Sequence, residues 1–380
     1  MKVQILQENL IKGLNIASRL ISSKVQLPIL SNVLLATEEN RLKIASTNLE
    51  MGVNVWVGVK IEKEGAITLP SRIFQEYIAF LPAEKIELEV KENIASLESG
   101  AFKASFNGIA ASEFPTFPKK EADIFTFSPE ILSGVVSQVA FASASDEGRP
   151  ILTGVSVKKI DGQLVFAATD GYRLSVKKID LEKAAAKGVK KGEIKDLVIP
   201  AKTLNEITKI VIEQGKQEQT LIEMGLTKDG NQVVFVFPDI ELSSRLLEGE
   251  FPDYEKIIPS EATSKIVLDK EGFEKAIKIA SIFARDSANI VKLNFKDGKV
   301  VISANSPQVG ENTSEIEAKI EGEGGEIAFN YRFLMDYLGA VSSPEINFEM
   351  NGPLNPGVFK IEKDPTFLHV VMPVRIQQEG

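Results

Sequence analysis

Residues 66–81, AITLPSRIFQEYIAFL, begin as an extended run rich in β-branched residues and continue as an amphipathic helix after a proline. The same order occurs in residues 196–211, DLVIPAKTLNEITKIV, and in residues 326–341, EIAFNYRFLMDYLGAV. A constant interval of 130 residues separates the three positions at which the helix is expected to begin: Pro70, Pro200 and Asn330. A repeat with this long a period indicates a chain built from three copies of one unit.

A second set of three segments precedes the first set. Amphipathic helices are predicted over residues 8–21, 129–142 and 270–284. Each is followed by β-rich sequence, and two of these β-rich runs start with an Asp-Gly pair that is typical of a tight hairpin: Asp161-Gly162 and Asp297-Gly298. Each unit is therefore predicted to contain the same pattern twice: a strand, then a helix, then further strands.

The pattern predicts an α+β fold with three similar domains and antiparallel sheets, because the strands are joined mostly by hairpin-length loops. Polar stretches around residues 118–123 and 259–264 are the expected linkers. The predicted boundaries are domain 1 over 1–119, domain 2 over 124–259, domain 3 over 265–376 and a tail over 377–380.

Composition narrows the possible functions. The 380 residues include no cysteine and one histidine, so a zinc site or thiolate chemistry has no ligands, and no GxxxxGK[ST] or GxGxxG motif is present. His369 lies in a predicted strand, FLHVVMPV, where a histidine at an ordinary strand position is expected rather than a member of a Ser-His-Asp triad. No segment reads as a signal peptide or a membrane span, and the lack of cysteine fits a reducing cytosol. The expectation is a cytoplasmic protein with no cofactor and no metal.

Charge is distributed unevenly between the helices and the rest of the chain. The six predicted helices carry nine Lys or Arg and eight Asp or Glu, whereas the whole chain has a net charge of −9. A cation occupies the same position of each second helix, two residues after the expected helix start: Arg72, Lys202 and Arg332. A cation in the first turn opposes the helix dipole, so its threefold recurrence favours a use that outweighs this cost. Helices surrounding a polyanion would explain both observations.

Several motifs in order then resemble one family, the β subunit of bacterial DNA polymerase III, the replicative sliding clamp. The motifs are LPILSNVLL (27–35), TNLEM (47–51), ATDGYRLS (168–175), EFPDYEKIIP (250–259) and VVMPVR (370–375), and the match spans Met1 to about Ile376. The resemblance implies a ring-shaped homodimer that is not an enzyme. Helices line the hole around duplex DNA, and the ring tethers the replicative polymerase, the clamp loader, repair polymerases and other partners.

The resemblance also implies a groove between the second and third domains in which short peptides of partner proteins dock. Matched by motif, its residues in this sequence are Leu152, Thr169, Gly171, Tyr172, Arg173, Leu174, Pro252, Lys256, Ile257, Val370, Met372, Pro373, Val374 and Arg375. Aliphatic side chains and a methionine would give an adaptable apolar surface. The sequence departs from the family in Pro150-Ile151, where an aromatic pair is usual, and in Lys256, where arginine is frequent.

Two further sets of residues follow from the resemblance. The expected neighbours of DNA phosphates are Lys24, Arg72, Arg149, Lys202 and Arg332. The expected contacts between two copies of the chain are Lys103, Ala104, Phe106, Ile282 and Phe283. The sequence leaves two alternatives open: a monomeric repeat scaffold that binds proteins without DNA, and a hydrolase acting through paired carboxylates such as Asp146-Glu147.

Overall fold

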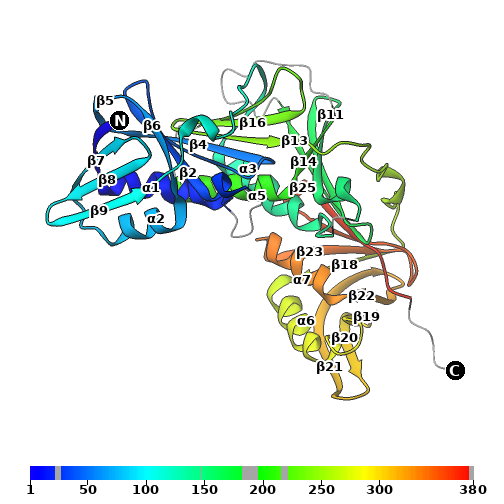
Figure 1. The fold of residues 1–380 in the computed structure, drawn as a ribbon. Coiled ribbons are helices and arrows are strands. Elements are labelled where there is room, and N and C mark those ends of the chain that lie inside the picture. Colours follow the sequence, from blue (N-terminus) through cyan, green and yellow to red (C-terminus); the bar gives the residue numbers. More distant parts are fainter. Residues whose placement is uncertain (22–26, 147, 182–195, 215–220, 376–380) are drawn as a thin grey trace. The chain divides into compact units, whose positions relative to one another are not determined.

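The computed structural model describes residues 1–21, 27–146, 148–181, 196–214 and 221–375 (Figure 1). The first repeat contains β1 (Lys2–Leu6), α1 (Gln7–Ala17), β2 (Asn32–Glu38), β3 (Arg41–Thr47), β4 (Met51–Gly58), β5 (Lys60–Lys63), β6 (Ala66–Pro70), α2 (Ser71–Phe80), β7 (Lys85–Lys91), β8 (Ile94–Ser99) and β9 (Phe102–Asn107). This order of strands and helices confirms the predicted α+β unit.

The other two repeats follow the same order. The second contains β10 (Ala122–Phe127), α3 (Pro129–Val139), β11 (Gly154–Ile160), β12 (Gln163–Thr169), β13 (Arg173–Asp180), β14 (Leu197–Pro200), α5 (Ala201–Gln214), β15 (Ile222–Leu226), β16 (Gln232–Phe237) and β17 (Ile240–Arg245). The third contains β18 (Ser264–Asp269), α6 (Lys270–Ala284), β19 (Ile290–Lys296), β20 (Lys299–Ser306), β21 (Gly310–Gly322), β22 (Gly325–Asn330), α7 (Tyr331–Ala340), β23 (Glu345–Met350), β24 (Gly357–Ile361) and β25 (Asp364–Val371).

Two predicted helices are shorter than expected. The predicted helix over 8–21 is α-helical only to Ala17, and the predicted helix over 129–142 only to Val139. Each continues as one tighter 3₁₀ turn, over Ser18–Leu20 and Ala140–Ala142. A final turn of this kind is common at helix ends and satisfies backbone groups that the α-helix leaves unpaired.

The predicted Asp-Gly hairpins are confirmed. Asp161-Gly162 joins β11 to β12, and Asp297-Gly298 joins β19 to β20, with both residues of each pair at positive φ. Two successive positive φ angles define the turn that matches the twist of a hairpin. The first repeat makes the same turn with Glu39-Asn40, at φ of 49° and 61°, which the sequence pattern did not reveal.

The described chain packs into two compact units. One holds residues 1–129 and 206–246, and the other holds residues 130–181, 196–205 and 247–375. The division runs through the second repeat because its strands are shared between two sheets. In the first unit the sheet order is β10-β15-β16-β17-β4-β3-β2-β6, beside a separate sheet β5-β1-β7-β8-β9. In the second unit one sheet runs β14-β11-β12-β13-β25-β24-β23-β18-β21-β20-β19-β22.

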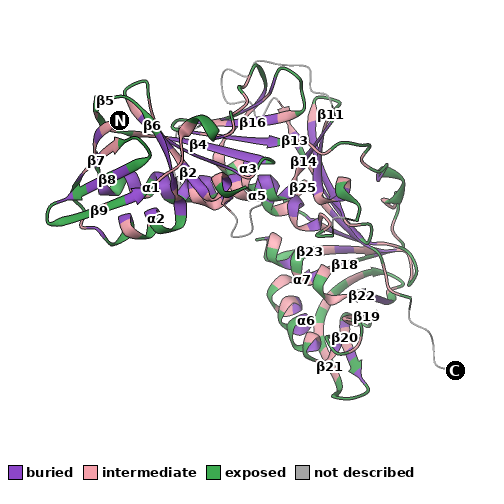
Figure 2. Cartoon of the chain, viewed as in Figure 1, coloured by how far each residue is buried: buried purple, intermediate pink, exposed green. Residues whose placement is uncertain are grey.

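Each large sheet is therefore continuous across the boundary between two repeats. We call the β4·β17 pair the first junction and the β13·β25 pair the second junction. Both pairs are antiparallel, and in each the first strand belongs to one repeat and the second strand is the last strand of the next repeat. Figure 2 shows β4 and β13 as largely buried strands.

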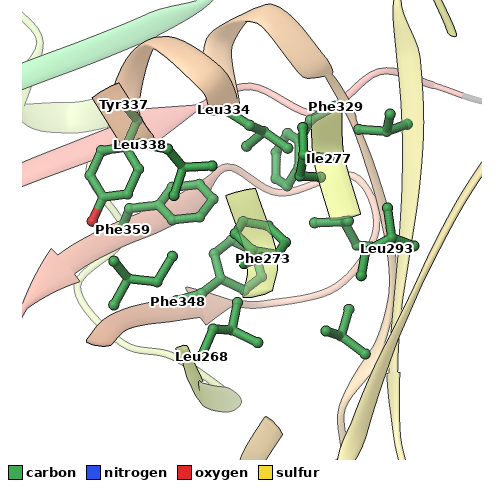
Figure 3. Packing of buried hydrophobic residues seen from close by; sticks show 14 of the residues in the cluster. Leu268, Phe273, Ile277, Leu293, Phe329, Leu334, Tyr337, Leu338, Phe348 and Phe359 are labelled. Carbon is green, nitrogen blue, oxygen red and sulfur yellow. The ribbon is translucent and has the colours of Figure 1, made fainter. Parts of the chain in front are cut away.

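Aromatic residues dominate the core of the third repeat (Figure 3). Phe348 and Phe359 lie with ring centres 4.7 Å apart between the sheet and the helices α6 and α7. Phe273 of α6 and Tyr337 of α7 are fully buried against them. Burial of each such side chain contributes about 1.5–3 kcal/mol, so this layer fixes both helices to the sheet.

Candidate functional site

The ATDGYRLS segment makes a tight turn over residues 169–173, between β12 and β13, that is fixed by its own side chains. The Thr169 hydroxyl accepts a hydrogen bond from the Gly171 amide at 3.0 Å and donates one to the Arg173 carbonyl at 2.6 Å. Asp170 Oδ1 accepts from the amides of Tyr172 and Arg173. Gly171 has φ of 92°, a conformation that a side chain would strain. The segment is thus a hairpin, as its Asp-Gly pair predicts, with the side chain of Tyr172 left outside.

Arg173 is the most heavily bonded side chain at the second junction, and its side chain is only 9% exposed. Its guanidinium donates to Asp170 at 3.0 Å, to Asp336 of α7 at 2.6 Å and to the carbonyl of Phe141 at 2.7 Å. It also lies 4.7 Å from the centre of the Phe333 ring. These contacts come from three different elements, so Arg173 holds the 169–173 turn, the 3₁₀ turn Ala140–Ala142 and α7 in fixed positions.

The residues after β25 continue along this turn. The Met372 amide donates to the Tyr172 carbonyl, and the Val374 amide donates to the Ala328 carbonyl, both at 2.8 Å. Met372 is 37% exposed, whereas Val370, two residues earlier in the chain, is buried. The structure therefore brings together two of the predicted groove segments, 169–174 and 370–375.

Residues 251–258 pack on the face of these strands that carries Leu174, Val176 and Val370. Tyr254 is buried against a cluster that includes Leu174, Val176 and Val370. This burial raises the pKa of the Tyr254 hydroxyl to about 12. Pro252, Lys256 and Ile257 flank Tyr254 and are exposed, and Lys256 forms an ion pair of 2.7 Å with Asp253. Within the described residues, none of these three makes a hydrogen bond or ion pair with the 169–174 or 370–375 segments.

Of the remaining predicted groove residues, Leu152 is buried and Arg375 is exposed. Arg149, predicted to lie near DNA, donates to the Asp170 carbonyl at 3.1 Å. A Cβ atom added to Gly171 would meet its guanidinium at 3.3 Å. Arg149 thus lies directly against the turn.

Three residues of this site were missed by the sequence reading: Phe141, Phe333 and Asp336. They are far from the turn in sequence, so a local sequence pattern cannot relate them to it. One signal was available, because Asp336 and Glu206 are acidic residues 130 positions apart on the equivalent helices α7 and α5.

The predicted DNA-facing cations occupy equivalent positions on their helices. Arg72, Lys202 and Arg332 are each the second residue of α2, α5 and α7, and all three are exposed. No carboxylate in the described part of the chain pairs with any of them. Asn330 caps α7 by accepting a hydrogen bond from the Arg332 amide. Lys24 lies outside the described residues.

The predicted dimer residues lie at two sheet edges that have no strand partner in the described chain. Lys103, Ala104 and Phe106 belong to β9, the last strand of its sheet (Figure 1). Phe106 packs against Phe74 and Tyr77 of α2, with ring centres 5.2 and 5.5 Å away. Ile282, 50% exposed, and Phe283 end helix α6, where Phe283 lies beside Gly310 at the start of β21. Within the described residues, the Gly310 half of β21 pairs only with β20.

The described residues contain no group of three or more side chains suited to hold a metal ion. None of their helices is long and apolar enough to cross a membrane.

Three α+β repeats joined by edge-to-edge strand pairs, with a rigid turn at the second junction, define a protein of the sliding-clamp fold. The sequence matches the DNA polymerase III beta subunit in three parts: its N-terminal domain over residues 1–118, its central domain over 126–253 and its C-terminal domain over 255–375. The beta sliding clamp of Staphylococcus epidermidis is 30% identical over 387 aligned residues that cover 99% of both chains. The chain belongs to the DNA polymerase III beta subunit family.

Solved structures agree with this assignment. The DNA polymerase sliding clamp of Bacillus subtilis has a TM-score of 0.91 at 29% identity, over 99% of this chain and 100% of that chain. The Bartonella birtlesii sliding clamp, solved bound to griselimycin, has a TM-score of 0.92 at 27% identity with the same coverage. The predicted family and fold are thereby confirmed.

Proposed function

We propose that two copies of this chain close into a ring around duplex DNA and tether DNA-processing proteins to it without catalysing a reaction. The observation that carries the proposal is the pair of unused sheet edges. One pairing scheme occurs twice within the chain, at β4·β17 and at β13·β25. A third use of the scheme would need the equivalent strands β21 and β9, and both lack that partner in the described chain.

The internal junctions predict the register of this third pairing. Met51 lies opposite Ser244, and Arg173 lies opposite Val371. By strand pairing in their hairpins, Gly310 corresponds to Met51 and Arg173, and Phe106 corresponds to Ser244 and Val371. Phe106 of one copy should therefore lie opposite Gly310 of the other, and Lys103 opposite Thr313.

The chemistry of the two edges supports this pairing. The β9 edge presents an exposed cation, Lys103, and an exposed ring, Phe102. The β21 edge presents the exposed acids Glu311 and Glu315, with the exposed apolar Val309 before it. Opposite charges and unpaired backbone groups attract two such strands, and exposed edges with apolar residues otherwise invite aggregation.

DNA would be held by topology and by weak phosphate contacts. Arg72, Lys202 and Arg332 are exposed and lack carboxylate partners in the described chain, so their charge is available to phosphates without sequence preference. The net charge of −9 would limit adhesion of the rest of the surface to DNA.

Partner proteins would dock through short peptides at the second junction, where Tyr172, Ile257 and Met372 offer exposed apolar surface beside a rigid turn. The expected partners are a replicative polymerase subunit, a clamp loader and repair polymerases, acting in the cytoplasm. Griselimycin bound to the Bartonella birtlesii relative supports ligand binding by this fold.

The register gives a sharp test, because the chain has no cysteine of its own. Lys103→Cys combined with Thr313→Cys should form a disulfide between copies on mild oxidation, since directly opposed strand residues lie within disulfide reach. The matched control, Lys103→Cys with Glu315→Cys, moves one partner two residues along the strand and should stay uncrosslinked. Sedimentation should give twice the 41.6 kDa chain mass. A monomer in sedimentation, with no crosslink in either variant, would leave the monomeric scaffold as the function.

A further inference from the structure

The chain has no cysteine, so its six methionines hold all of its sulfur, and they differ in exposure. Four are buried, with at most 6% of each residue exposed: Met1, Met51, Met224 and Met350. Met335 of α7 is half-buried and packs against the core of the third repeat. Met372 is 37% exposed. Its sulfur is therefore the one that a dissolved reagent reaches most easily.

Met372 lies at the proposed docking site, beside the turn of the second junction. Its amide donates to the Tyr172 carbonyl at 2.8 Å, which fixes its backbone while the side chain stays accessible. The Val374 amide donates to the Ala328 carbonyl at 2.8 Å and holds the segment two residues further on. Tyr172, Ile257 and Met372 supply the exposed apolar surface of this site. Of these three side chains, only that of Met372 contains sulfur.

We propose that Met372 is a site of reversible oxidation, and that its sulfoxide closes the docking site to apolar peptide side chains. The proposal rests on the peptide-docking role proposed above and names a regulation of that site. The oxidants are hydroperoxides, of which hydrogen peroxide is the simplest. The thioether sulfur gives two electrons to one peroxide oxygen, so that the O–O bond breaks and an S–O bond forms. The second oxygen takes both protons and leaves as water.

The modification can be reversed by known chemistry. A methionine sulfoxide reductase transfers two electrons from a dithiol to the sulfoxide. The S–O bond breaks, the oxygen leaves as water, and the dithiol becomes a disulfide. Oxidation of Met372 is therefore a change that a cell can make and undo without replacing the protein.

Oxidation makes the side chain of Met372 polar at the point where an apolar anchor would pack. A thioether is a flexible apolar group and a weak hydrogen-bond acceptor, whereas the sulfoxide oxygen is polar and is solvated by water in the free protein. Docking of an apolar anchor removes that water, and the anchor has no donor to replace it. Burial of such an unpaired polar group weakens binding about five- to a hundredfold.

The test follows oxidation and docking in the same full-length protein. The probe is a synthetic peptide with a glutamine and two spaced apolar anchors, titrated calorimetrically before and after treatment with dilute hydrogen peroxide. Peptide mapping by mass spectrometry should find one added oxygen on Met372 while the four buried methionines remain unmodified. The oxidised protein should bind the probe about five- to a hundredfold more weakly, and the reductase should restore the affinity.

Two variants separate Met372 from the other methionines. Met372→Leu has an apolar side chain without sulfur, so peroxide should leave this variant's own starting affinity unchanged. Met335→Leu is the matched control, because it removes the half-buried methionine of α7. It should lose affinity on oxidation as the wild type does.

Three results would overturn the proposal: oxidation of a buried methionine before Met372, unchanged affinity of wild type that carries the Met372 sulfoxide, or an equal loss of affinity in peroxide-treated Met372→Leu. Thermal melting of the oxidised wild type should give the midpoint of the untreated protein, which assigns the lost affinity to the site rather than to unfolding. Failure of the untreated wild type to bind the probe would overturn the docking role instead, and the peptide map reports the oxidation of Met372 independently of that result.

Discussion

The first and second junctions share a backbone and differ in their side chains. Thr47 and Asn48 make the same hydrogen bonds to the 47–51 turn that Thr169 and Asp170 make to the 169–173 turn. The Arg245 amide donates to the Glu50 carbonyl as the Met372 amide donates to the Tyr172 carbonyl. Backbone geometry alone therefore does not distinguish the two junctions.

The cation that links neighbouring repeats comes from a different element at each junction. At the second junction Arg173 of the turn pairs with Asp336, over the ring of Phe141. At the first junction Met51 occupies the position equivalent to Arg173 and carries no charge. The cation is instead Arg19, which occupies the position equivalent to Phe141 in the 3₁₀ turn of the first repeat and forms ion pairs with Glu206 and Glu213. Charge complementarity has been kept although the residues that supply it have changed.

The polar residue pair lies on opposite faces of the strands in the two junctions. The second junction pairs Ser175 with His369 on one face and Val176 with Leu368 on the other. At the equivalent positions the first junction pairs Val53 with Leu242 and Asn54 with Glu241. Each junction therefore contains one polar pair and one apolar pair, on opposite faces.

Two leucines distinguish the first junction from a docking site. Leu49 stands where the second junction has Gly171, at φ of 74°, and Leu27 stands where it has Arg149. Glycine leaves the turn open for Arg149 and for a ligand backbone, whereas leucine places a side chain there at a conformational cost. This difference explains why docking is proposed at one junction only.

Replacing the cation at each junction by methionine should have the largest effect on the free energy of unfolding. Arg173→Met, which imports the residue of the first junction, leaves Asp170 and Asp336 facing each other and the Phe141 carbonyl without its donor. We expect a loss of about 2–3 kcal/mol in the free energy of unfolding, discounted because Asp336 is 47% exposed. Arg19→Met should cost only about 1 kcal/mol, since Glu213 is 44% exposed. Urea denaturation measures both, and equal losses would remove the distinction between the junctions.

Acid should weaken the second junction through His369. Burial lowers the pKa of His369 to about 3, and its Nδ1 lies 2.7 Å from the Ser175 hydroxyl. Because the unfolded chain takes up the proton near pH 6.5 and the folded chain does not, stability is complete above pH 6.5 and falls as the pH drops, by up to about 1.4 kcal/mol per pH unit. The double variant His369→Leu with Ser175→Val, which imports the apolar pair, should be less pH-dependent between pH 6.5 and 5. An identical slope in urea titrations of both proteins would exclude His369 as the cause.

The smallest effect, of opposite sign, is expected from Glu241. Burial beside Asn54 raises the pKa of its carboxyl group above 4.5. The folded chain then holds a proton that the unfolded chain has released, so this contribution to stability is present below pH 4.5 and is lost as the pH rises through the raised pKa. Glu241→Leu with Asn54→Val should stabilise the protein at pH 8 by less than about 1 kcal/mol, with a smaller gain at pH 5. A destabilised variant at pH 8 would show that Glu241 contributes as a carboxylate.

Local pattern was enough to predict most of the fold. Apolar periodicity and the residue before each helix located α2, α5 and α7, and Asp-Gly pairs located two hairpins. The junctions could not be predicted in this way, because β4 and β17 lie almost 190 residues apart and their pairing depends on tertiary register. The same limit hid Asp336 and Phe333, whose contacts with Arg173 cross 163 and 160 residues of sequence. The candidate groove residues came from family resemblance, and two of their segments meet at the second junction.

Topological retention on DNA tests the central claim most directly. The Lys103→Cys, Thr313→Cys protein is oxidised in the presence of closed circular duplex DNA, and the mixture is washed at 1 M salt, which removes phosphate contacts. The account predicts that crosslinked protein stays on the circle and is released when a single cut linearises it. Loss from the intact circle, or equal retention after the cut, would contradict a ring that encircles DNA.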